Sequence, residues 1–408
     1  MCPQEPSVLR RRGAAMPASS GLDLFANPVL TDPYPTYARL RKLGAVVHLD
    51  AHAVWAVPRH ADVAAVLRDP NTYSSERALA LTDEVNEVVL TGSVVASDGA
   101  VHARLRRVLS RQLAPRALKS LATGMHEHAR ALVASLPQGQ VFDGVADLAA
   151  PFVADTVMRL TGLPEQDRGH VLDLADAVFD VFGPDNARTR AAMPRAEQMF
   201  TYLDRVATRQ RIAPDSWLGA IHRAADQGEI DETQAVQLML SYTVAGMDTT
   251  ILAISTALHL LARHPKQWDL VRNGTVASDA VFAEALRLEA PVQFFGRRTT
   301  RDVHVGDTLI PAGDRVLLLY GSAGRDHAKW GPTADNFDVT RPDCRDHLAL
   351  GLGAHQCAGN HLAAMEFAAL LAALTARFPT LSPSPDETPI RRLHNILRGP
   401  RSLPLIAA

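Results

Sequence analysis

The sequence predicts a mainly α-helical protein with minor β-sheets, and three observations support this fold class. Apolar residues repeat with the helical period in nearly every segment from about residue 101 to residue 290. Residues 238–262 form the most apolar stretch and are long enough for one central helix. Alternating patterns typical of strands are short and lie outside this helical region. No repeat or low-complexity linker divides the chain, so we expect one large domain over residues 21–408.

The first twenty residues are expected to be a flexible leader. They carry a run of arginines but no apolar segment after it, so they do not predict a signal peptide. Met16 is an alternative start. Residues 32–70 then predict a helix, two alternating strands over a short turn, and a second helix.

The helical region is punctuated by turn-forming segments, each with a proline: LAPRA, GLPEQD, FGPDN and RHPKQ. Strand patterns return in residues 298–320, where Gly306-Asp307 suits a hairpin turn. A final pair of strands is expected within residues 396–408.

Composition excludes several classes of protein. Hydrophobic residues make up 47% and charged residues 21%, which is typical of globular domains and not of disordered chains. The net charge of -2 predicts no general attraction to nucleic acid or to an anionic membrane. The three cysteines, Cys2, Cys344 and Cys357, are too few for a disulfide framework and fit a reducing cytoplasm. Asp248 would be costly in lipid, so residues 238–262 predict a buried core helix and not a membrane span.

Cys357 lies in LGLGAHQCAGN, residues 350–360, directly before a strong helical pattern. Glycines there favour a tight loop or a close approach, and a thiolate at the start of a helix is stabilised by the helix dipole. His355 and Cys357 could also bind zinc, but no second pair of ligands completes a tetrahedral site. A thiol nucleophile would need a base, which nothing in the sequence supports.

The predicted central helix has polar residues at its middle: Gly246, Asp248, Thr249 and Thr250. Such residues compete with the backbone ladder and often bend a helix. One interpretation is a kinked core helix whose polar groups are satisfied. The other is an opening that holds water beside a carboxylate and an alcohol, which together relay protons.

Two further groups of charges have an ordinary and a functional interpretation. Glu284 and Arg287 lie on neighbouring helix positions among apolar residues, which favours at least partial burial of an ion pair. His102 and Arg106 lie one helical turn apart. Arg297 follows the segment of Glu284 and Arg287, and His355 lies in the loop of Cys357. Each of these four cations alone would be a solvated surface charge. Together they could clamp a buried pair of carboxylates.

These motifs, in this order, resemble those of the cytochromes P450 over roughly residues 30–404. LGLGAHQCAG resembles the family's haem-binding loop, Phe-Gly-x-Gly-x-His-x-Cys-x-Gly, and AGMDTT resembles its oxygen-activating helix. Glu284 and Arg287 resemble the family's ExxR pair, with Arg341 as the third member, and SAGRD (322–326) resembles its ANRD segment. Two departures are Leu350 in place of phenylalanine and Gly324 in place of asparagine.

The resemblance implies the cytochrome P450 fold, with a long oxygen-activating helix over haem b, and a role for each motif. Cys357 would be the thiolate ligand of the haem iron, which favours O–O cleavage. Gly351, Gly353 and Gly359, with Ala245 and Gly246, would allow close approach to the porphyrin. His102, Arg106, Arg297 and His355 would hold its propionates, and Asp248 and Thr249 would relay protons. Glu284, Arg287 and Arg341 would be structural.

The resemblance also implies a cytoplasmic bacterial monooxygenase that is monomeric and uses O2. Electrons would come from a separate ferredoxin or flavodoxin with its NAD(P)H reductase. Arg104, Arg107 and Arg111 form a basic stripe that could dock an acidic partner or could be solvated surface. No nucleic acid or membrane partner is expected.

Four segments resemble the branch of bacterial cytochromes P450 that demethylates para-methoxybenzoates. They are NTYSSERALALTD, AVFDVFGPDN, APVQFFGR and the region of Ser241. By this match Phe179, Phe182, Val244, Val292 and Phe295 would line a slot for an aromatic ring, with Arg77 and Ser241 receiving its carboxylate. Leu240 replaces an arginine of that branch, so a methoxyphenol is an alternative substrate.

Other activities of the same fold remain open at this stage. They are hydroxylation or phenol coupling of a secondary metabolite, peroxide chemistry, and ligand binding without catalysis. The presence of both Asp248 and Thr249 argues against the last, because a carrier has no use for a proton relay.

Overall fold

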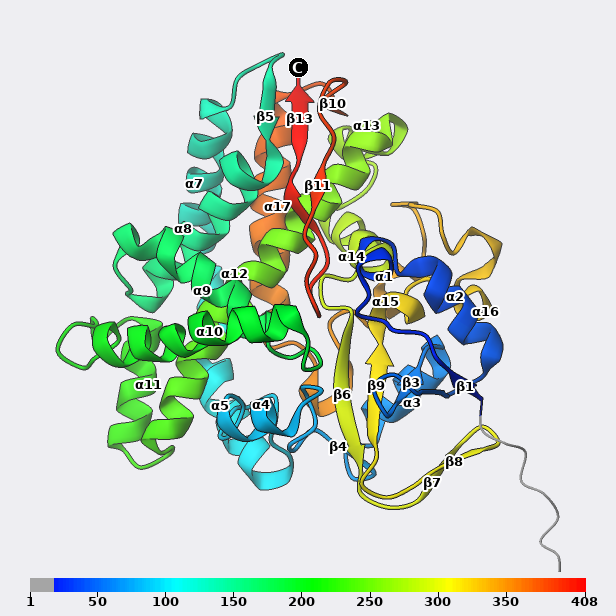
Figure 1. Ribbon diagram of the computed structural model, residues 1–408. Helices are drawn as coiled ribbons and strands as arrows, with labels where there is room; N and C mark the ends of the chain where they lie inside the picture. Colours follow the sequence, from blue (N-terminus) through cyan, green and yellow to red (C-terminus); the bar gives the residue numbers. More distant parts are fainter. Residues whose placement is uncertain (1–17) are drawn as a thin grey trace, which may run out of the picture.

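The computed structural model describes residues 18–408, and residues 1–17 lie outside the described chain. Helices form one side of the molecule, and a twisted sheet with its covering helices forms the other (Figure 1). Ser19 and Ser20 form strand β1 and pair in parallel with His48 and Leu49. The expected leader boundary at residue 20 is therefore wrong, because these two residues already belong to a sheet. The rest of the predicted leader falls outside the described residues.

The main sheet has six strands in the order β1-β2-β3-β9-β6-β4. Their bounds are β1 Ser19–Ser20, β2 Val47–Leu49, β3 Val54–Val57, β4 Tyr73–Ser74, β6 Phe294–Thr299 and β9 Arg315–Leu319. Helices α1 (Asn27–Thr31), α2 (Tyr34–Leu43), α3 (His60–Arg68), α15 (Tyr320–Ala323) and α16 (His327–Trp330) accompany it. The predicted helix, strand pair and helix of residues 32–70 are confirmed as α2, β2, β3 and α3.

The predicted helical region is confirmed except for one short strand, β5 (Val141–Asp143). Its helices are α5 Gly99–Leu113, α6 Pro115–Lys119, α7 Ala122–Ser135, α8 Ala150–Thr161, α9 Arg168–Asp180, α10 Ala187–Val206, α11 Trp217–Asp226, α12 Glu232–Arg263, α13 Pro265–Arg272 and α14 Ser278–Leu288, and a short helix, α4 (Asp83–Val88), precedes the region. A π-helical turn, η1 (Gly144–Ala149), precedes α8, and the 3-10 turn η2 (Glu165–Asp167) precedes α9. Pro115 and Pro265 each lie in the first turn of a helix, as expected.

Three smaller sheets complete the described chain. Strands β7 (Val303–Val305) and β8 (Thr308–Ile310) form the predicted hairpin at Gly306-Asp307. Strands β10 (Leu381–Pro383) and β5 flank β13 (Pro404–Ala407), while β11 (Ile390–Arg391) pairs with β12 (Pro400–Ser402). The expected final pair of strands is thus present as β12 and β13, but the two strands belong to different sheets.

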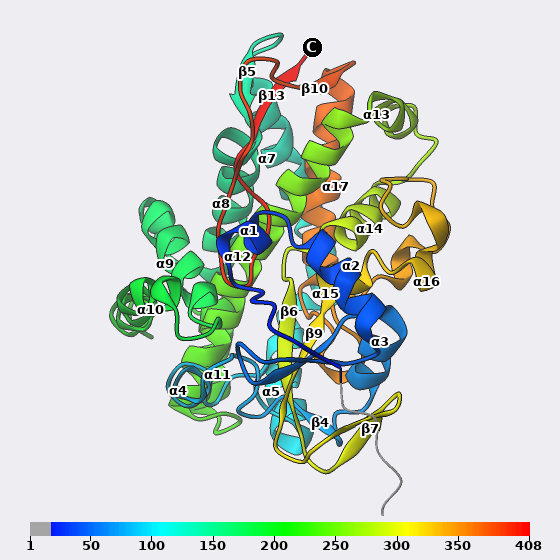
Figure 2. The ribbon, with the colours of Figure 1, turned by 45° about the vertical axis from the view of Figure 1, so that its right-hand side comes forward.

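Helix α12 runs through the interior of the molecule and contacts α8, α9, α14 and α17 (Asn360–Arg377) (Figure 2). Among the described helices it is the one long and apolar enough to span a membrane, and 78% of its apolar window is buried inside the protein. This burial agrees with the predicted core helix. Asp231 caps its first turn, and Gln234 completes the capping box.

Two segments bring the C-terminal third of the chain to the core. A loop with the 3-10 turns η3 (Gly331–Thr333) and η4 (Cys344–Asp346) follows α16. The next loop contains η5 (Gly353–His355) and leads into α17, which packs against α7 and α14. Cys357 lies between η5 and α17.

Candidate active site

The loop that carries Cys357 is closed by its own backbone and by two glycines with positive φ. The Cys357 N–H donates to the Leu350 carbonyl at 2.8 Å, which brings the two ends of the loop together. Gly351 and Gly353 have φ of 69° and 72°, in the left-handed region that favours glycine. A Cβ at Gly353 would also lie 2.9 Å from the Leu67 carbonyl oxygen. The glycines therefore let this loop turn tightly against α3.

The Cys357 sulfur is accessible to solvent although protein surrounds it. Burial raises the pKa of the Cys357 thiol, while backbone N–H groups of Gly359 and Asn360 and the charge of Arg106 oppose the rise. Each of these opposing groups stabilises a thiolate. An accessible sulfur with this set of donors suits a ligand for a soft or borderline metal ion.

Three of the four predicted cations gather beside this loop. The imidazole rings of His102 and His355 lie 4.2 Å apart, centroid to centroid. Arg106 donates from Nη2 to the Gln356 carbonyl at 2.6 Å, so α5 is tied to the loop. The His102 Nε2 is buried and has no hydrogen-bond partner among the described residues. Burial, with the nearby cations His355 and Arg106, lowers the pKa of His102 to about 4.

His355 is oriented by Asp98, a residue that the sequence did not single out. The His355 Nε2 lies 2.9 Å from Asp98 Oδ1. Asp98 also accepts hydrogen bonds from the Ser74 hydroxyl at 2.6 Å and the Ser75 N–H at 2.8 Å. Although burial opposes it, these hydrogen bonds hold the pKa of Asp98 well below its usual range. Asp98 precedes the first residue of α5, and that position was its only signal in the sequence.

Arg297, the fourth predicted cation, is brought to the interior by strand β6. It is 4% exposed and donates from Nη1 to the Gly296 carbonyl at 2.7 Å. No hydrogen bond in the described chain joins it to His102, Arg106 or His355. A buried guanidinium with one backbone partner has donors to spare for an anionic ligand.

The middle of α12 keeps accessible surface on one side only. Ala245 is exposed, and Ser241, Gly246 and Thr249 are half-buried on a helix whose other central residues are buried. Helical spacing places Ser241, Ala245 and Thr249 on one side. The Thr249 hydroxyl donates to the Ala245 carbonyl at 2.7 Å. The structure assigns unbroken α-helix through this region, so the predicted break in the backbone ladder is absent.

Asp248 is buried next to this accessible side. It is 3% exposed, and its Oδ2 has no hydrogen-bond partner among the described residues. The Asp248 Oδ1 lies 3.9 Å from Nη1 of Arg392, which also contacts Asp176 Oδ1 at 2.5 Å. Burial raises the pKa of Asp248 to about 7, Arg392 opposes the rise, and Asp176 and Asp173 add to it. A carboxyl group with a pKa near neutrality can both give and take a proton.

His394 belongs to the same group and fixes the backbone beside it. Its Nδ1 accepts hydrogen bonds from the N–H groups of Ile396 and Leu397 at 3.1 and 2.9 Å, so the proton of the neutral ring lies on Nε2. That nitrogen lies 3.2 Å from the Asp176 carbonyl oxygen. Arg392, His394 and Asp176 were missed from the sequence because no periodic pattern connects residues 392–397 with α9.

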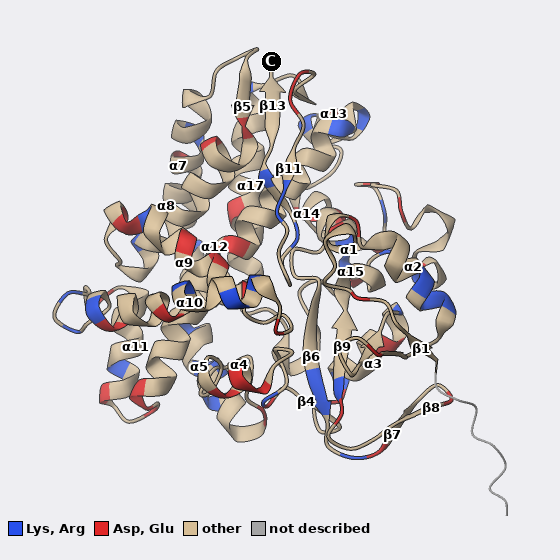
Figure 3. Cartoon of the chain, viewed as in Figure 1, with Lys and Arg blue, Asp and Glu red and all other residues tan. Residues whose placement is uncertain are grey.

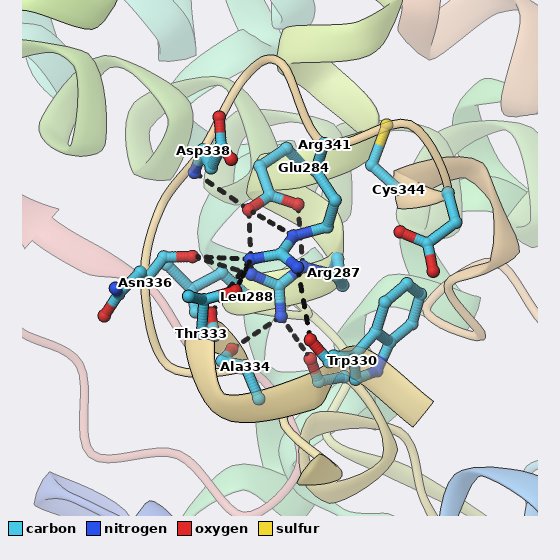
Figure 4. Close-up of polar contacts among 12 residues, drawn as sticks. Glu284, Arg287, Leu288, Trp330, Thr333, Ala334, Asn336, Asp338, Arg341 and Cys344 are labelled. Carbon is cyan, nitrogen blue, oxygen red and sulfur yellow. Dashed lines mark hydrogen bonds and ion pairs between the residues drawn. The ribbon is translucent and has the colours of Figure 1, made fainter. Parts of the chain in front are cut away.

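The predicted Glu284 and Arg287 pair is fully buried and has a third member, as Figure 4 shows. Arg287 donates from Nε and Nη2 to both Glu284 oxygens, at 2.7 and 2.8 Å. Arg341 donates from Nε to Glu284 Oε1 at 3.3 Å. The remaining donors of the two arginines meet backbone carbonyl oxygens of Gly324, Trp330, Thr333, Ala334 and Asn336. This group holds the loop after α16 against α14.

The apolar residues predicted to line an aromatic slot lie in or against the main hydrophobic core. Phe179 and Phe182 are each 5% exposed, and their ring centroids lie 5.8 Å apart in an edge-to-face arrangement. Val244 and Leu240 are buried in the same apolar cluster. Half-buried Val292 and Phe295 pack against that cluster from the start of β6.

Arg77 and Ser241 are not brought together as a carboxylate site. The Arg77 side chain is 67% exposed, and its nearest acid is Glu87, at 4.0 Å. Ser241 donates to the Gln237 carbonyl at 2.9 Å, as hydroxyls inside helices often do. In this structure the Arg77 side chain therefore lies at the surface and not in the predicted slot. Its backbone lies at φ 52°, in the sparsely populated left-handed region.

The described residues contain no group of three or more His, Cys, Asp or Glu side chains placed to hold a metal ion. The zinc alternative for Cys357 therefore has no ligand set. The polar groups that remain available are the exposed Cys357 thiol, the unpartnered Nε2 of His102 beside the Cys357 loop, and the Arg297 guanidinium on β6, which has one backbone partner.

Comparisons of sequence point to one family. The family profile described as Cytochrome P450 matches residues 277–406. The chain is 36% identical over 398 residues to Cytochrome p450 CYP199A2 of Rhodopseudomonas palustris, with 97% of this chain and 95% of the relative covered. It is 31% identical over 403 residues to Cytochrome P450 monooxygenase PikC of Streptomyces venezuelae, with 96% and 95% covered.

Solved structures show the same architecture. Cytochrome P450 CYP109Q5 from Chondromyces apiculatus superposes with a TM-score of 0.81 at 28% identity, over 96% of this chain and 99% of that one. Cytochrome P450 CREJ, in complex with (4-ethylphenyl) dihydrogen phosphate, gives a TM-score of 0.82 at 26% identity. The match with CREJ covers 93% of this chain and 98% of that chain.

Proposed function

The chain belongs to the cytochrome P450 family, and from this membership we propose which of its residues hold the haem, move protons and bind the substrate. Members of the family bind haem b through a cysteine thiolate, so the chain is a haem-thiolate monooxygenase. The observations that carry the assignment of residues are the exposed Cys357 at the end of a glycine-containing loop and the stripe of accessible residues on the otherwise buried helix α12.

In the proposed site, Cys357 is the thiolate ligand of the haem iron. Gly351 and Gly359 leave room beside the loop, and Ala245 and Gly246 present a small surface from α12. His102, Arg106, Arg297 and His355 bind the two propionates, which is supported by the unpartnered His102 Nε2 and the spare donors of Arg297. When bound, the haem supplies the binding and activation of O2.

Proton delivery is proposed to follow from Asp248 and Thr249. The pKa of Asp248 near 7 lets its carboxyl group donate a proton and recover it at neutral pH. The Thr249 hydroxyl, which donates to Ala245 in this structure, can turn toward water on the accessible side of α12. Asp248 would therefore supply protons to water that Thr249 orders. Thr249→Ala should lower product formed per electron and raise release of hydrogen peroxide.

The proposed reaction is oxidative O-demethylation of a para-methoxybenzoate-like acid. One oxygen atom of O2 enters a methyl C–H bond, and the other leaves as water with two electrons and two protons. The resulting hemiacetal collapses to the phenol and formaldehyde. Support comes from the aromatic slot of Phe179 and Phe182 and from the aromatic ligand that the CREJ structure names.

The carboxylate of such a substrate would require Arg77 to turn inward. Its present ion pair with Glu87 is long and exposed, and an exposed pair of this kind is worth only about 0–1 kcal/mol. A new, desolvated pair with the substrate would therefore outweigh the pair that is lost. Ser241 would add a hydroxyl donor once it releases the Gln237 carbonyl.

The haem ligand is tested by the spectrum of the reduced, CO-bound protein. Thiolate ligation predicts a strongly red-shifted Soret band, which Cys357→Ala should abolish. Cys344→Ala is the matched control, because Cys344 is buried beside Ala280 and should not affect the band. An imidazole-type band in the parent protein would contradict the assignment.

The substrate is tested by titration of the spin-state change with 4-methoxybenzoate and with anisole. The acid should bind more tightly than anisole and release formaldehyde on turnover. Breaking a desolvated charge pair costs about 3–5 kcal/mol, so Arg77→Leu should weaken binding of the acid by roughly two to four decades. Arg116→Leu, at an exposed arginine on α6, should change nothing. Equal affinity for acid and anisole would point to a neutral aromatic substrate instead.

The proposed electron donor is a separate ferredoxin or flavodoxin with its NAD(P)H reductase, acting in the cytoplasm on a monomer. Arg104 and Arg107 on α5 are exposed and available to an acidic partner. Arg111, the third residue of the predicted stripe, is instead held by Glu229 through two hydrogen bonds of 2.9 and 2.7 Å. The free part of the stripe is therefore smaller than the sequence predicted.

A further inference from the structure

A cavity of about 480 Å³ lies behind the second half of α12, far from the Cys357 loop. It is partly open to solvent and is lined by residues of α12, the end of α14, the turn between α15 and α16, the loop after η3 and the β11–β12 region. Its lining residues are Thr256, His259, Leu260, Arg263, His264, Leu288, Glu289, Arg325, Asp335, Asn336, Phe337, Pro389, Arg391 and Pro400. His259 lies ten residues beyond Thr249, about 15 Å along the helix. None of the residues proposed to bind haem or substrate lines it.

Three arginines and two acids line this cavity, so its charges do not balance. Asp335, one of the acids, lies 3.7 Å from Arg325 and 2.8 Å from His327. Glu289 is already paired with Arg325 at 2.8 Å and with Arg398 at 3.0 Å. Its distance to Arg391 is 3.6 Å, and no hydrogen bond joins the two. Arg263 has no ion pair or side-chain hydrogen bond within the part of the chain that the structure describes. Arg391 and Arg263 therefore provide two guanidinium groups with donors left over on one side of the cavity.

His259 adds a third polar group to the same side. Its Nδ1 is buried and has no hydrogen-bond partner among residues 18–408. Burial, followed by the charges of Arg391 and Arg263, lowers the pKa of His259 to about 4. The imidazole is therefore neutral at pH 7 and has one N–H to offer. His259, Arg263 and Arg391 line the same cavity, and the two arginine charges act on the ring more strongly than the opposing charge of Glu289.

Another part of the cavity wall is apolar. Leu260, Leu288 and Phe337 come from α12, α14 and the loop after η3, and Pro389 and Pro400 come from the β11–β12 pair. A cavity of this size is within the usual range for small-molecule sites, which combine an apolar lining with a few convergent polar groups. A bare inorganic anion would use the guanidinium groups but would leave the apolar wall in contact with water.

We propose that this cavity binds a small organic carboxylate with a compact apolar body, at a site separate from the haem. The carboxylate is held by Arg263 and Arg391 through charge-assisted hydrogen bonds, with His259 as a further donor. The apolar body packs between Leu260, Phe337 and the two prolines. This inference does not depend on which substrate the haem site oxidises.

The test uses the haem-loaded protein with its haem site blocked. Saturating 4-phenylimidazole occupies the iron and the space above it, and the nitrogen-ligand spectrum of the haem confirms that it is bound. Titration with 4-fluorobenzoate, monitored by its ¹⁹F NMR signal, should then still show saturable binding. A hydrogen bond to a charged group contributes about 1.5–3 kcal/mol, so Arg263→Gln combined with Arg391→Gln should weaken binding at least about tenfold.

Three controls distinguish this site from the haem site. Arg77→Leu should not change the residual binding, whereas it should weaken the spin-state titration in the unblocked protein. Arg116→Gln should change neither measurement. Arg263→Gln alone, at an exposed residue, gives a variant whose folding is not at risk. It should weaken binding severalfold, and an unchanged haem spectrum in every variant checks that each one is folded.

Three results would overturn the proposal. The first is the absence of saturable binding in the blocked protein, and the second is binding that the double variant leaves unchanged. The third is displacement of 4-fluorobenzoate by an equal concentration of inorganic phosphate, because the apolar wall would then contribute nothing. If the unblocked protein shows no spin-state response to 4-methoxybenzoate while the blocked protein still binds 4-fluorobenzoate, only the proposed substrate is contradicted.

Discussion

Asp248 and Glu366 both hold a carboxyl group in the protein interior, where ionisation is costly. Asp248 has Arg392 nearby, and its pKa rises to about 7. Glu366, on α17, is 0% exposed and neither of its oxygens has a hydrogen-bond partner among the described residues. Burial alone raises the pKa of Glu366 well above its ordinary value of 4.5. The folded protein therefore keeps this side chain protonated.

We predict that Glu366→Gln stabilises the protein increasingly as the pH rises. The folded pKa is raised, so the parent loses stability once the pH exceeds the unfolded pKa, because folding then requires uptake of a proton. The neutral amide avoids this loss, at about 1.4 kcal/mol per pH unit until the folded pKa is reached. Urea unfolding of both proteins between about pH 5 and about pH 8 measures the difference. Parallel stability curves would contradict a protonated Glu366.

We predict that Asp176→Asn lowers the pKa of Asp248. The substitution removes a negative charge that raises this pKa and frees Arg392 to approach Asp248. The pH at which product per electron changes should shift downward. Difference infrared spectra of the carboxyl band, assigned with Asp248→Asn, would report the same shift independently of turnover.

Asp173→Asn is the matched control for this prediction. Asp173 also raises the pKa of Asp248, but it is exposed and has no contact with Arg392. Its substitution should therefore shift the profile less than Asp176→Asn does. Equal shifts would mean that the position of Arg392 has no part in setting the pKa.

At the scale of secondary structure, local sequence signals predicted most elements but did not predict which strands pair with one another. The helical periodicity found α12, and Gly306-Asp307 marked the β7–β8 turn, because both signals lie within a few residues of the element. Strands β12 and β13 were found, but not their separate sheets, because β13 pairs with β5 from a distant part of the chain, while β12 pairs with the two-residue strand β11, which is too short to show a pattern. The placement of Arg392 beside Asp248 depends on that pairing and was missed for the same reason.

The candidate active site shows the same division between residues that a local motif predicts and residues whose positions depend on distant contacts. Cys357, Asp248 and the Glu284–Arg287 pair could be predicted because their motifs are short and ordered. Asp98, which orients His355, has no motif of its own. Arg77 was expected in the substrate slot, but the structure turns it to the surface at a strained backbone position. The direction of a side chain on a loop depends on packing that no local pattern records.

Gly324 occupies the position at which the family's ANRD segment has asparagine, and this difference gives a testable prediction. A Cβ at residue 324 would overlap the carbonyl oxygen of Arg287, at the end of α14. Gly324→Asn should therefore destabilise the fold by about 1–3 kcal/mol, because the loop must move away from the helix. Thermal unfolding measures the loss. Gly169→Ala, on α9 where a Cβ would meet nothing within 4 Å, is the control and should not destabilise.

For the whole molecule, the net charge of -2 and the mixture of acidic and basic residues over its elements imply no strong overall field (Figure 3). Association with an acidic electron donor must then depend on a local patch. Arg104 and Arg107 are exposed cations of α5 without an ion pair among the described residues, although Arg104 donates to Gln234 Oε1 at 3.5 Å.

We predict that Arg104→Glu with Arg107→Glu slows reduction by the donor protein and weakens its dependence on salt. Long-range attraction raises association rates and is screened by ions, so its removal lowers both quantities. Stopped-flow reduction at several ionic strengths measures them, and the haem spectrum should not change. Arg195→Glu, at an exposed arginine on α10, is the control. Reduction as fast and as salt-dependent as in the parent would exclude this face as the docking site.

The buried arginines of Figure 4 have a consequence for the order in which the chain folds. Two guanidinium groups share one carboxylate, so carbonyl oxygens between residues 324 and 336 surround the surplus positive charge much as a crown ether surrounds a cation. That segment contains only the short helix α16 and the 3-10 turn η3, and the Arg287 side chain of α14 ties its carbonyl groups together. Its amide protons should therefore exchange with solvent as one cooperative unit, together with those of α14.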